Sequence, residues 1–84
     1  MKHAGPSTLD QLGPLLARIR TQPGLKEKSR GVFYFRSRSV LHFHEDAAGT
    51  FADLRVADVF ERLAVDSLQE QEVLLQRLKQ LIKS

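Results

Sequence analysis

The sequence contains no cysteine, and this absence excludes disulfide bonds, thiolate zinc sites and cysteine nucleophiles. For a chain this small, it also fits a reducing compartment better than a secreted environment. No apolar run reaches the ~18 residues of a membrane span, and the N-terminal residues lack the apolar core of a signal peptide. We therefore expect a cytoplasmic protein without a membrane partner.

Motifs of the common enzyme classes are also missing. The sequence has no glycine-rich phosphate loop, no nucleophile elbow, no HExxH helix and no convincing pair of catalytic carboxylates. It therefore favours a protein without enzymatic activity, and it requires no cofactor.

The 84 residues are 42% hydrophobic and 27% charged, which is ordinary for one small globular domain. We predict a flexible tail over residues 1–6 and a single domain over residues 7–84. The formal net charge is +3, and several basic residues crowd into one stretch that only Glu27 opposes. This basic patch consists of Lys26, Lys28, Arg30, Arg36 and Arg38. It would attract phosphate groups if its side chains converge; the alternative is that these side chains only solvate loops and a strand edge.

Two apolar repeats predict helices at the two ends of the domain. Leucine and isoleucine recur at three- and four-residue steps over residues 9–19. Gly13-Pro14 interrupts this repeat, so we expect either a kink or a later start of the helix, with Pro14 in its first turn. A stronger repeat runs over residues 68–82, and Ser67 with Glu70 has the spacing of a capping box at its start. Between the helices, short turn signals separate four β-rich segments: residues 32–36, 39–45, 50–56 and 59–65. Connections this short allow only antiparallel pairing. We therefore predict a two-layer α+β sandwich, a helix, a meander of three or four antiparallel strands and a helix, with both helices on one face of the sheet.

The two faces of the sheet follow from the expected hairpins. A two-residue turn at Ser37 and Arg38 and a loop at residues 46–49 set the pairing of the first three strands. One face then holds the apolar side chains that meet the helices: Val32, Tyr34, Leu41, Phe43, Ala52, Leu54 and Val56. The other, open face holds Phe33, Phe35, Val40, His42, His44, Phe51, Asp53 and Arg55.

The open face carries the most specific candidate site. His42 and His44 project from the same side of one strand, and in this register Asp53 stands opposite His42. Two imidazoles and a carboxylate suit zinc or iron, with Asp46 as a further carboxylate within reach. The same trio would also serve acid–base catalysis, because a carboxylate raises the basicity of an imidazole. The alternative is that the histidines are polar-face residues that stack against nearby phenylalanines.

The phenylalanines of the open face lead to the main functional hypothesis. Phe33, Phe35 and Phe51 lie beside the histidines on a face that no remaining segment covers. We therefore expect a binding or interaction module whose open face meets a protein partner or forms a homodimer. A further alternative is that these rings, beside Arg55 and the basic patch, stack the bases of single-stranded nucleic acid.

The middle of the chain resembles a group of small uncharacterised bacterial proteins. The resemblance lies in FRSR at residues 35–38, LHFHED at residues 41–46 and G-x-F-A-D-L at residues 49–54, and it continues weakly to the C-terminal helix. The His-x-His-x-Asp pattern is also similar to bacterial domains labelled luciferase-like, a label without established chemistry. This resemblance implies a compact α+β domain, and it carries no functional residues over.

Overall fold

The computed structural model describes residues 2–83. Six strands and three helices follow one another in these residues, in the order β1, α1, α2, β2, β3, β4, β5, β6, α3. The helices are α1 (Pro6–Gln11), α2 (Gly13–Arg20) and α3 (Leu68–Lys83). The strands are β1 (Lys2–His3), β2 (Leu25–Ser29), β3 (Val32–Phe35), β4 (Arg38–Asp46), β5 (Gly49–Val56) and β6 (Val59–Ala64). None of the helices in this range is long and apolar enough to cross a membrane.

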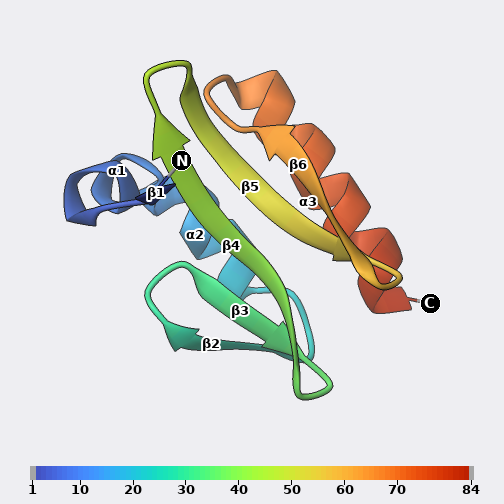
Figure 1. The fold of residues 1–84 in the computed structure, drawn as a ribbon. Helices are drawn as coiled ribbons and strands as arrows, with labels where there is room; N and C mark the ends of the chain where they lie inside the picture. The colour runs from blue at the N-terminus through green and yellow to red at the C-terminus, as the bar shows by residue number, and fades with distance from the viewer. Residues whose placement is uncertain (1, 84) are drawn as a thin grey trace.

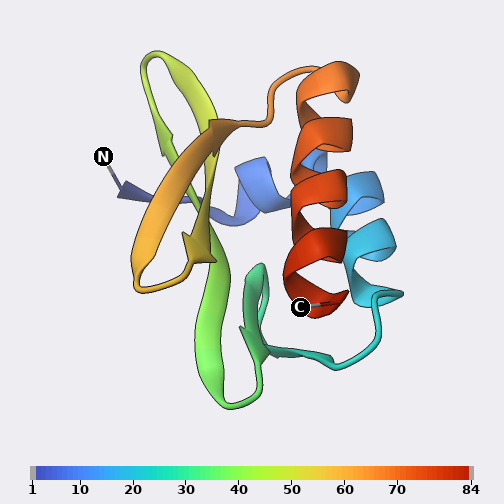
Figure 2. The same ribbon diagram turned by 90° about the vertical axis from the view of Figure 1, so that its right-hand side faces the viewer.

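The strands form one antiparallel sheet in the order β2-β3-β4-β5-β6, and β1 pairs with the part of β4 that β3 does not reach (Figure 1). All three helices lie on one side of this sheet (Figure 2). No other element of residues 2–83 covers the second side, which we call the open face. The predicted two-layer α+β sandwich with an antiparallel meander is therefore confirmed, and β6 confirms the fourth predicted strand.

The N-terminal apolar repeat forms two short helices, and the expected helix start with Pro14 in the first turn is confirmed for α2. Helix α1 ends before Leu12, and Pro14 lies in the first turn of α2, where a missing backbone donor leaves no bond unmade. Leu12 is still buried, so the break turns the chain without removing this side chain from the core. At the start of α3 the predicted capping box is confirmed: the Ser67 amide donates to Glu70 Oε1 (2.9 Å), and the Glu70 amide donates to Ser67 Oγ (3.1 Å).

The hydrophobic core lies between the helices and the inner face of the sheet. Each helical repeat turns its apolar stripe inward, because covering the sheet removes both apolar surfaces from water. The buried apolar residues are Leu12, Leu15, Leu16 and Ile19 at the N-terminal helices, Leu74, Leu75 and Leu78 on α3, and Phe33, Val40, Leu41, Phe43, Ala52, Leu54 and Val65 on or beside the sheet.

The predicted register between β4 and β5 is confirmed. His42 lies opposite Asp53, and His44 lies opposite Phe51. The turn between these strands falls inside the predicted loop at residues 46–49. A short hairpin of this kind sets its own register, so local sequence was sufficient to place these pairs.

The predicted register of the β3–β4 hairpin is wrong. Its turn residues are Arg36 and Ser37, with φ angles of 53° and 67°, instead of Ser37 and Arg38. Positive φ at both central residues is the geometry that matches the twist of the flanking strands, and it usually calls for glycine or asparagine. Because the turn contains neither glycine nor asparagine, the sequence did not reveal which two residues form it.

A β-bulge also interrupts this hairpin. Tyr34 pairs with Ser39 and Phe33 pairs with Leu41, so Val40 is the extra residue of β4. Val40 and Leu41 are neighbours in sequence and yet both are buried, at 4% and 0% exposure. The bulge thus shifts the alternation of side chains by one residue along this part of β4.

The β-bulge corrects the expected contents of the open face. Phe33 and Val40 lie in the core, and Phe35 packs against it, so none of the three is on the open face as predicted. Tyr34, expected on the inner face, instead lies on the outer side opposite Lys26 of β2. The physical reason is that a shift of one residue exchanges the two faces of a strand.

Two strands lie where the sequence has no strand pattern. β2 has the sequence LKEKS and pairs with β3 at the edge of the sheet. β1 lies in the residues assigned to the N-terminal tail, with His3 opposite His44, and the next amide, of Ala4, donates to the Phe43 carbonyl (3.0 Å). Both strands are specified by the neighbours they pair with more than by their own residue types.

We expect Gly49→Ala to lower the free energy of unfolding by about 1–3 kcal/mol. Gly49 has a φ of 142°, and a Cβ atom there would lie 2.3 Å from Asp66 Oδ2. The same Asp66 carboxylate accepts the Thr50 amide (3.0 Å), so it cannot move away freely. Gly13→Ala is the matched control, because a Cβ at Gly13 meets no atom within 4 Å. Urea denaturation measures both variants; equal stability of Gly49→Ala and wild type would contradict the expectation.

Candidate functional site

The three histidines of the chain come together on the open face of the sheet. His3 is on β1, and His42 and His44 are on β4. Their ring centroids are separated by 4.6 Å (His3–His44), 4.8 Å (His42–His44) and 6.1 Å (His3–His42). We call these residues the histidine cluster. His3 was not predicted to belong to it, because only the pairing of β1 with β4 brings it there.

Asp53 of β5 provides the carboxylate of the cluster, as the predicted register requires. It is 6% exposed, and its Oδ2 lies 3.5 Å from His42 Nε2 and 3.0 Å from His44 Nδ1. The contact with His44 lacks the alignment of a hydrogen bond. His44 Nδ1 is buried, and it therefore has no hydrogen-bond partner within residues 2–83. Asp46, the other carboxylate considered, caps the β4–β5 turn instead, where its Oδ1 accepts the Ala48 amide (2.8 Å).

Arg62 of β6 holds the Asp53 carboxylate from the other side. Its Nε donates to Oδ1 (2.8 Å) and its Nη2 donates to Oδ2 (2.9 Å), which is the bidentate geometry of a strong ion pair. This guanidinium is the main reason that the pKa of Asp53 lies below its usual value, and it outweighs the opposing effect of burial. Asp53 is therefore a carboxylate at neutral pH.

Sequence reasoning did not include Arg62 in the site. Arg62 lies opposite Asp53 in the β5–β6 ladder, across a two-residue turn at Ala57 and Asp58. The sequence contained the information needed to place Arg62, because a two-residue turn at Ala57 and Asp58 fixes the pairing of β5 with β6. Paired residues then have numbers that add to 115, as Asp53 and Arg62 do.

His42 is held in its neutral form by its surroundings. Burial is the main cause that lowers its pKa, and the neighbouring His44 adds to this effect. The ring of Phe60 lies edge-on to it, with centroids 4.9 Å apart. A neutral imidazole is the form that binds a metal or accepts a proton.

Two more of the predicted site residues, Phe51 and Arg55, are on β5. Phe51 is half-buried beside His44, and Arg55 of β5 donates to the Ser39 carbonyl (2.7 Å). The Arg55 guanidinium also lies over the ring of Phe60, 4.5 Å from its centroid. Phe60 therefore belongs to the open face, where it stands in the kind of position that was predicted for Phe33 and Phe35.

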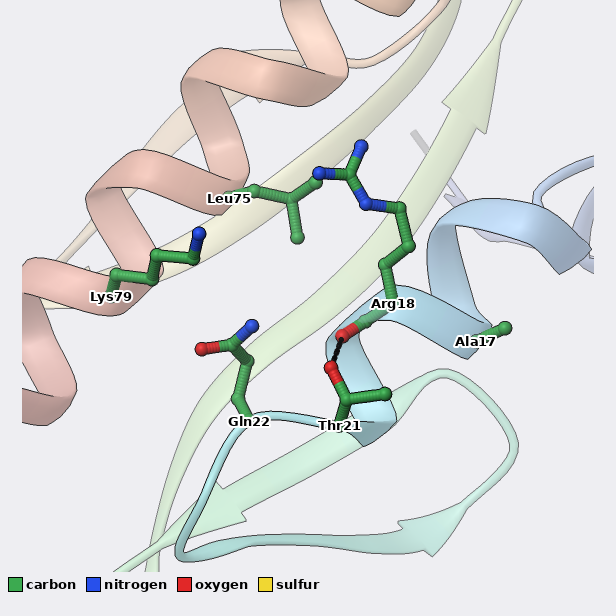
Figure 3. Close-up of a pocket in the computed structure, with 6 residues that line it drawn as sticks. All are labelled: Ala17, Arg18, Thr21, Gln22, Leu75 and Lys79. Atoms are coloured by element: carbon green, nitrogen blue, oxygen red, sulfur yellow. Dashed lines mark hydrogen bonds between the residues drawn. The ribbon is translucent and has the colours of Figure 1, made fainter.

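The helix layer carries a separate pocket of about 410 Å³ between α2 and α3 (Figure 3). Lys79 and Leu75 line it from α3, and Arg18 lines it from α2. Thr21 Oγ1 donates to the Arg18 carbonyl (2.7 Å) at its edge. This pocket is on the opposite side of the sheet from the histidine cluster, so the two do not form one site.

Comparison with protein-family models found no match, and comparison with curated proteins and with solved structures found none at the significance required. The resemblance to uncharacterised bacterial proteins and to luciferase-like domains therefore stays a prediction.

We expect the protein to lose stability as the pH falls below neutrality. The pKa values of His42 and Asp53 are both lowered in the folded state, so the unfolded chain binds more protons and acid favours unfolding. The contribution of His42 is lost as the pH falls from its ordinary value of 6.5 through its lower folded value, and that of Asp53 is lost below its ordinary value of 3.8.

Urea denaturation of wild type and His42→Gln between pH 7.5 and 5 measures the first of these contributions. The urea midpoint of wild type should fall over this range, and that of His42→Gln should fall less. Identical slopes for the two proteins would show that His42 does not cause the loss.

Proposed function

We propose that the protein binds a divalent transition-metal ion of the zinc class at the open face of the sheet. The observation that carries this proposal is the convergence of His42, His44 and Asp53, whose potential ligand atoms all lie within 4.8 Å of one another. The residue types are those that hold zinc and other borderline metals in proteins.

The spacing of the Asp53 oxygen from each imidazole supports the proposal. Ligands about 2.0–2.1 Å from a tetrahedral zinc ion are separated from one another by roughly 3.3 Å. Asp53 Oδ2 lies 3.5 Å from His42 Nε2 and 3.0 Å from His44 Nδ1, on either side of this value. A metal ion would also satisfy His44 Nδ1, which is buried without a partner.

The protonation states and the surrounding residues fit the same role. The carboxylate of Asp53 is ionised and the His42 ring is neutral, as metal ligands must be. Arg62 uses one lone pair on each Asp53 oxygen and orients the carboxylate, so Oδ2 keeps a second lone pair for an ion. His3 is exposed beside His44 and supplies a fourth ligand in this proposal.

Acid–base catalysis by the same residues has less support. A carboxylate that acts with a histidine base must orient one ring nitrogen through a hydrogen bond. Asp53 instead directs both oxygens to Arg62, and its approach to His44 is not a hydrogen bond.

We expect one zinc ion to bind per chain in isothermal titration of EDTA-treated protein. Asp53→Asn and His42→Ala should weaken binding by at least about 100-fold, since each removes a direct ligand. Asp46→Asn is the matched control: it makes the same change on a residue outside the cluster and should bind zinc like wild type. His3→Ala should cause a smaller loss.

Cobalt provides an independent readout, because its visible spectrum reports the ligands directly. No binding of zinc or cobalt by folded wild type would overturn the proposal. An equal loss in Asp46→Asn and Asp53→Asn would overturn the assigned ligand set.

As a second function, we propose that copies of the chain associate through the open face and strand β6. β6 is an edge strand whose Val59 and Phe60 are 67% and 40% exposed. An exposed edge with apolar side chains favours pairing with another copy. The structure gives this association less support than the sequence did, because Phe33 and Phe35, two of the phenylalanines expected on the open face, lie in or against the core.

Sedimentation equilibrium tests this association. Wild type should be a dimer at about 100 μM, and Phe60→Asp should shift it to monomer. Leu68→Asp is the matched control, because Leu68 is 80% exposed at the start of α3, where an acidic residue suits the helix. A wild-type protein that is monomeric at this concentration would overturn the proposal.

A further inference from the structure

Two adjoining hollows lie at the end of the sheet where the β3–β4 hairpin turns. One has a volume of about 550 Å³ and is lined by Lys26, Lys28 and Arg36 among others; the other, of about 220 Å³, is lined by Arg36, Arg38 and Arg55. They share the lining residues Phe35 and Arg36, so they are neighbours, and we call the two hollows together the basic groove. No acidic residue lines either hollow.

The cations of the basic groove are poorly neutralised. Within residues 2–83, Lys26, Lys28 and Arg36 make no ion pair with a carboxylate. Arg38 pairs with Asp58 at 3.2 Å, but both side chains are largely exposed, so this pair screens little of the charge. The groove is therefore an uncompensated positive surface.

Four of the five residues of the basic patch predicted from sequence line this groove. The exception is Arg30, whose guanidinium donates to Asp10 (2.5 Å) away from the groove. The other members meet only because β2, the β3–β4 turn and the start of β4 lie together in the sheet.

Flat groups accompany the charges in the basic groove. Lys28 Nζ lies over the ring of Tyr34, 4.6 Å from its centroid, and the Arg36 guanidinium lies over the ring of Phe35 at 5.0 Å. Aromatic rings and guanidinium planes are the surfaces on which unpaired bases stack. The groove thus alternates cations with stacking surfaces.

We propose that the basic groove binds a single strand of nucleic acid. Its lysines and arginines contact successive phosphates, and Tyr34 with the Arg36–Phe35 pair stacks the bases. A single phosphate would need only one of the hollows, whereas two neighbouring hollows, each lined by cations, offer contacts for several successive nucleotides. The proposal uses none of the zinc ligands, and it stands or falls separately from metal binding.

Fluorescence anisotropy with a fluorescein-labelled twelve-residue oligothymidylate, and with oligouridylate of the same length, tests the proposal in the presence of EDTA. Wild type should bind at 50 mM salt and lose affinity steeply by 200 mM, because each phosphate contact adds about 0.7 to the slope of log affinity against log salt. The triple variant Lys26→Gln, Lys28→Gln, Arg36→Gln should bind at least about 10-fold more weakly and lower this slope by about 2.

The matched control is the triple variant Arg30→Gln, Lys79→Gln, Lys83→Gln, which removes the same charge outside the basic groove. It should stay within about 3-fold of wild type, since only long-range attraction is lost. Tyr34→Ala should weaken binding by about 5-fold or more, and Tyr34→Phe, which keeps the ring, should not. Thermal unfolding of each variant establishes that it is folded.

Three outcomes would overturn the proposal. The first is no binding of either oligonucleotide by wild type at 50 mM salt, and the second is equal weakening in the two triple variants. The third is equally strong competition, at matched phosphate concentration, by a twelve-base-pair duplex or by vesicles of phosphatidylglycerol, because the groove would then recognise negative charge alone.

Discussion

The alternation of side chains along β4 is the constraint on which the rest of the structure depends. This strand pairs with β1, β3 and β5, and it is the only one in the described sheet with three partners. Leu41 and Phe43 point into the core, and His42 and His44, which alternate with them, point to the open face. A slip of one residue would expose two apolar side chains and bury two imidazoles. The alternation is broken only by the bulge at Val40, near one end of the strand, which adds an extra apolar residue to the core.

The ion pair between Asp53 and Arg62 allows a buried carboxylate to lie on the open face of the sheet. A carboxylate that is 6% exposed is costly to bury unless both oxygens find partners, and Arg62 provides both. The pair also connects β5 to the edge strand β6 on the side that no helix of residues 2–83 covers. It leaves His44 Nδ1 close to the carboxylate, buried and without a hydrogen-bond partner in residues 2–83.

The sheet presents two chemically different regions along β4. Near residues 42–44, imidazoles and a carboxylate form a compact group suited to a small cation. Near residues 36–40, arginines from the β3–β4 turn and β4, with lysines from β2, line two neighbouring hollows that contain no acidic lining residue.

The sequence by itself determined the elements whose signals are local. Apolar periodicity and the Ser67–Glu70 capping box defined α3, and a short loop defined the β4–β5 hairpin and so placed Asp53 opposite His42. Only the tertiary structure decided what depends on distant strands: His3 joins the site through β1, and Arg62 joins it through the register of β6. No turn residue in the sequence marks the bulge that places Phe33 and Phe35 toward the core; its extra residue, Val40, is itself buried there. Local propensity sets which segments become strands and helices, whereas burial and pairing between segments decide which face each side chain occupies.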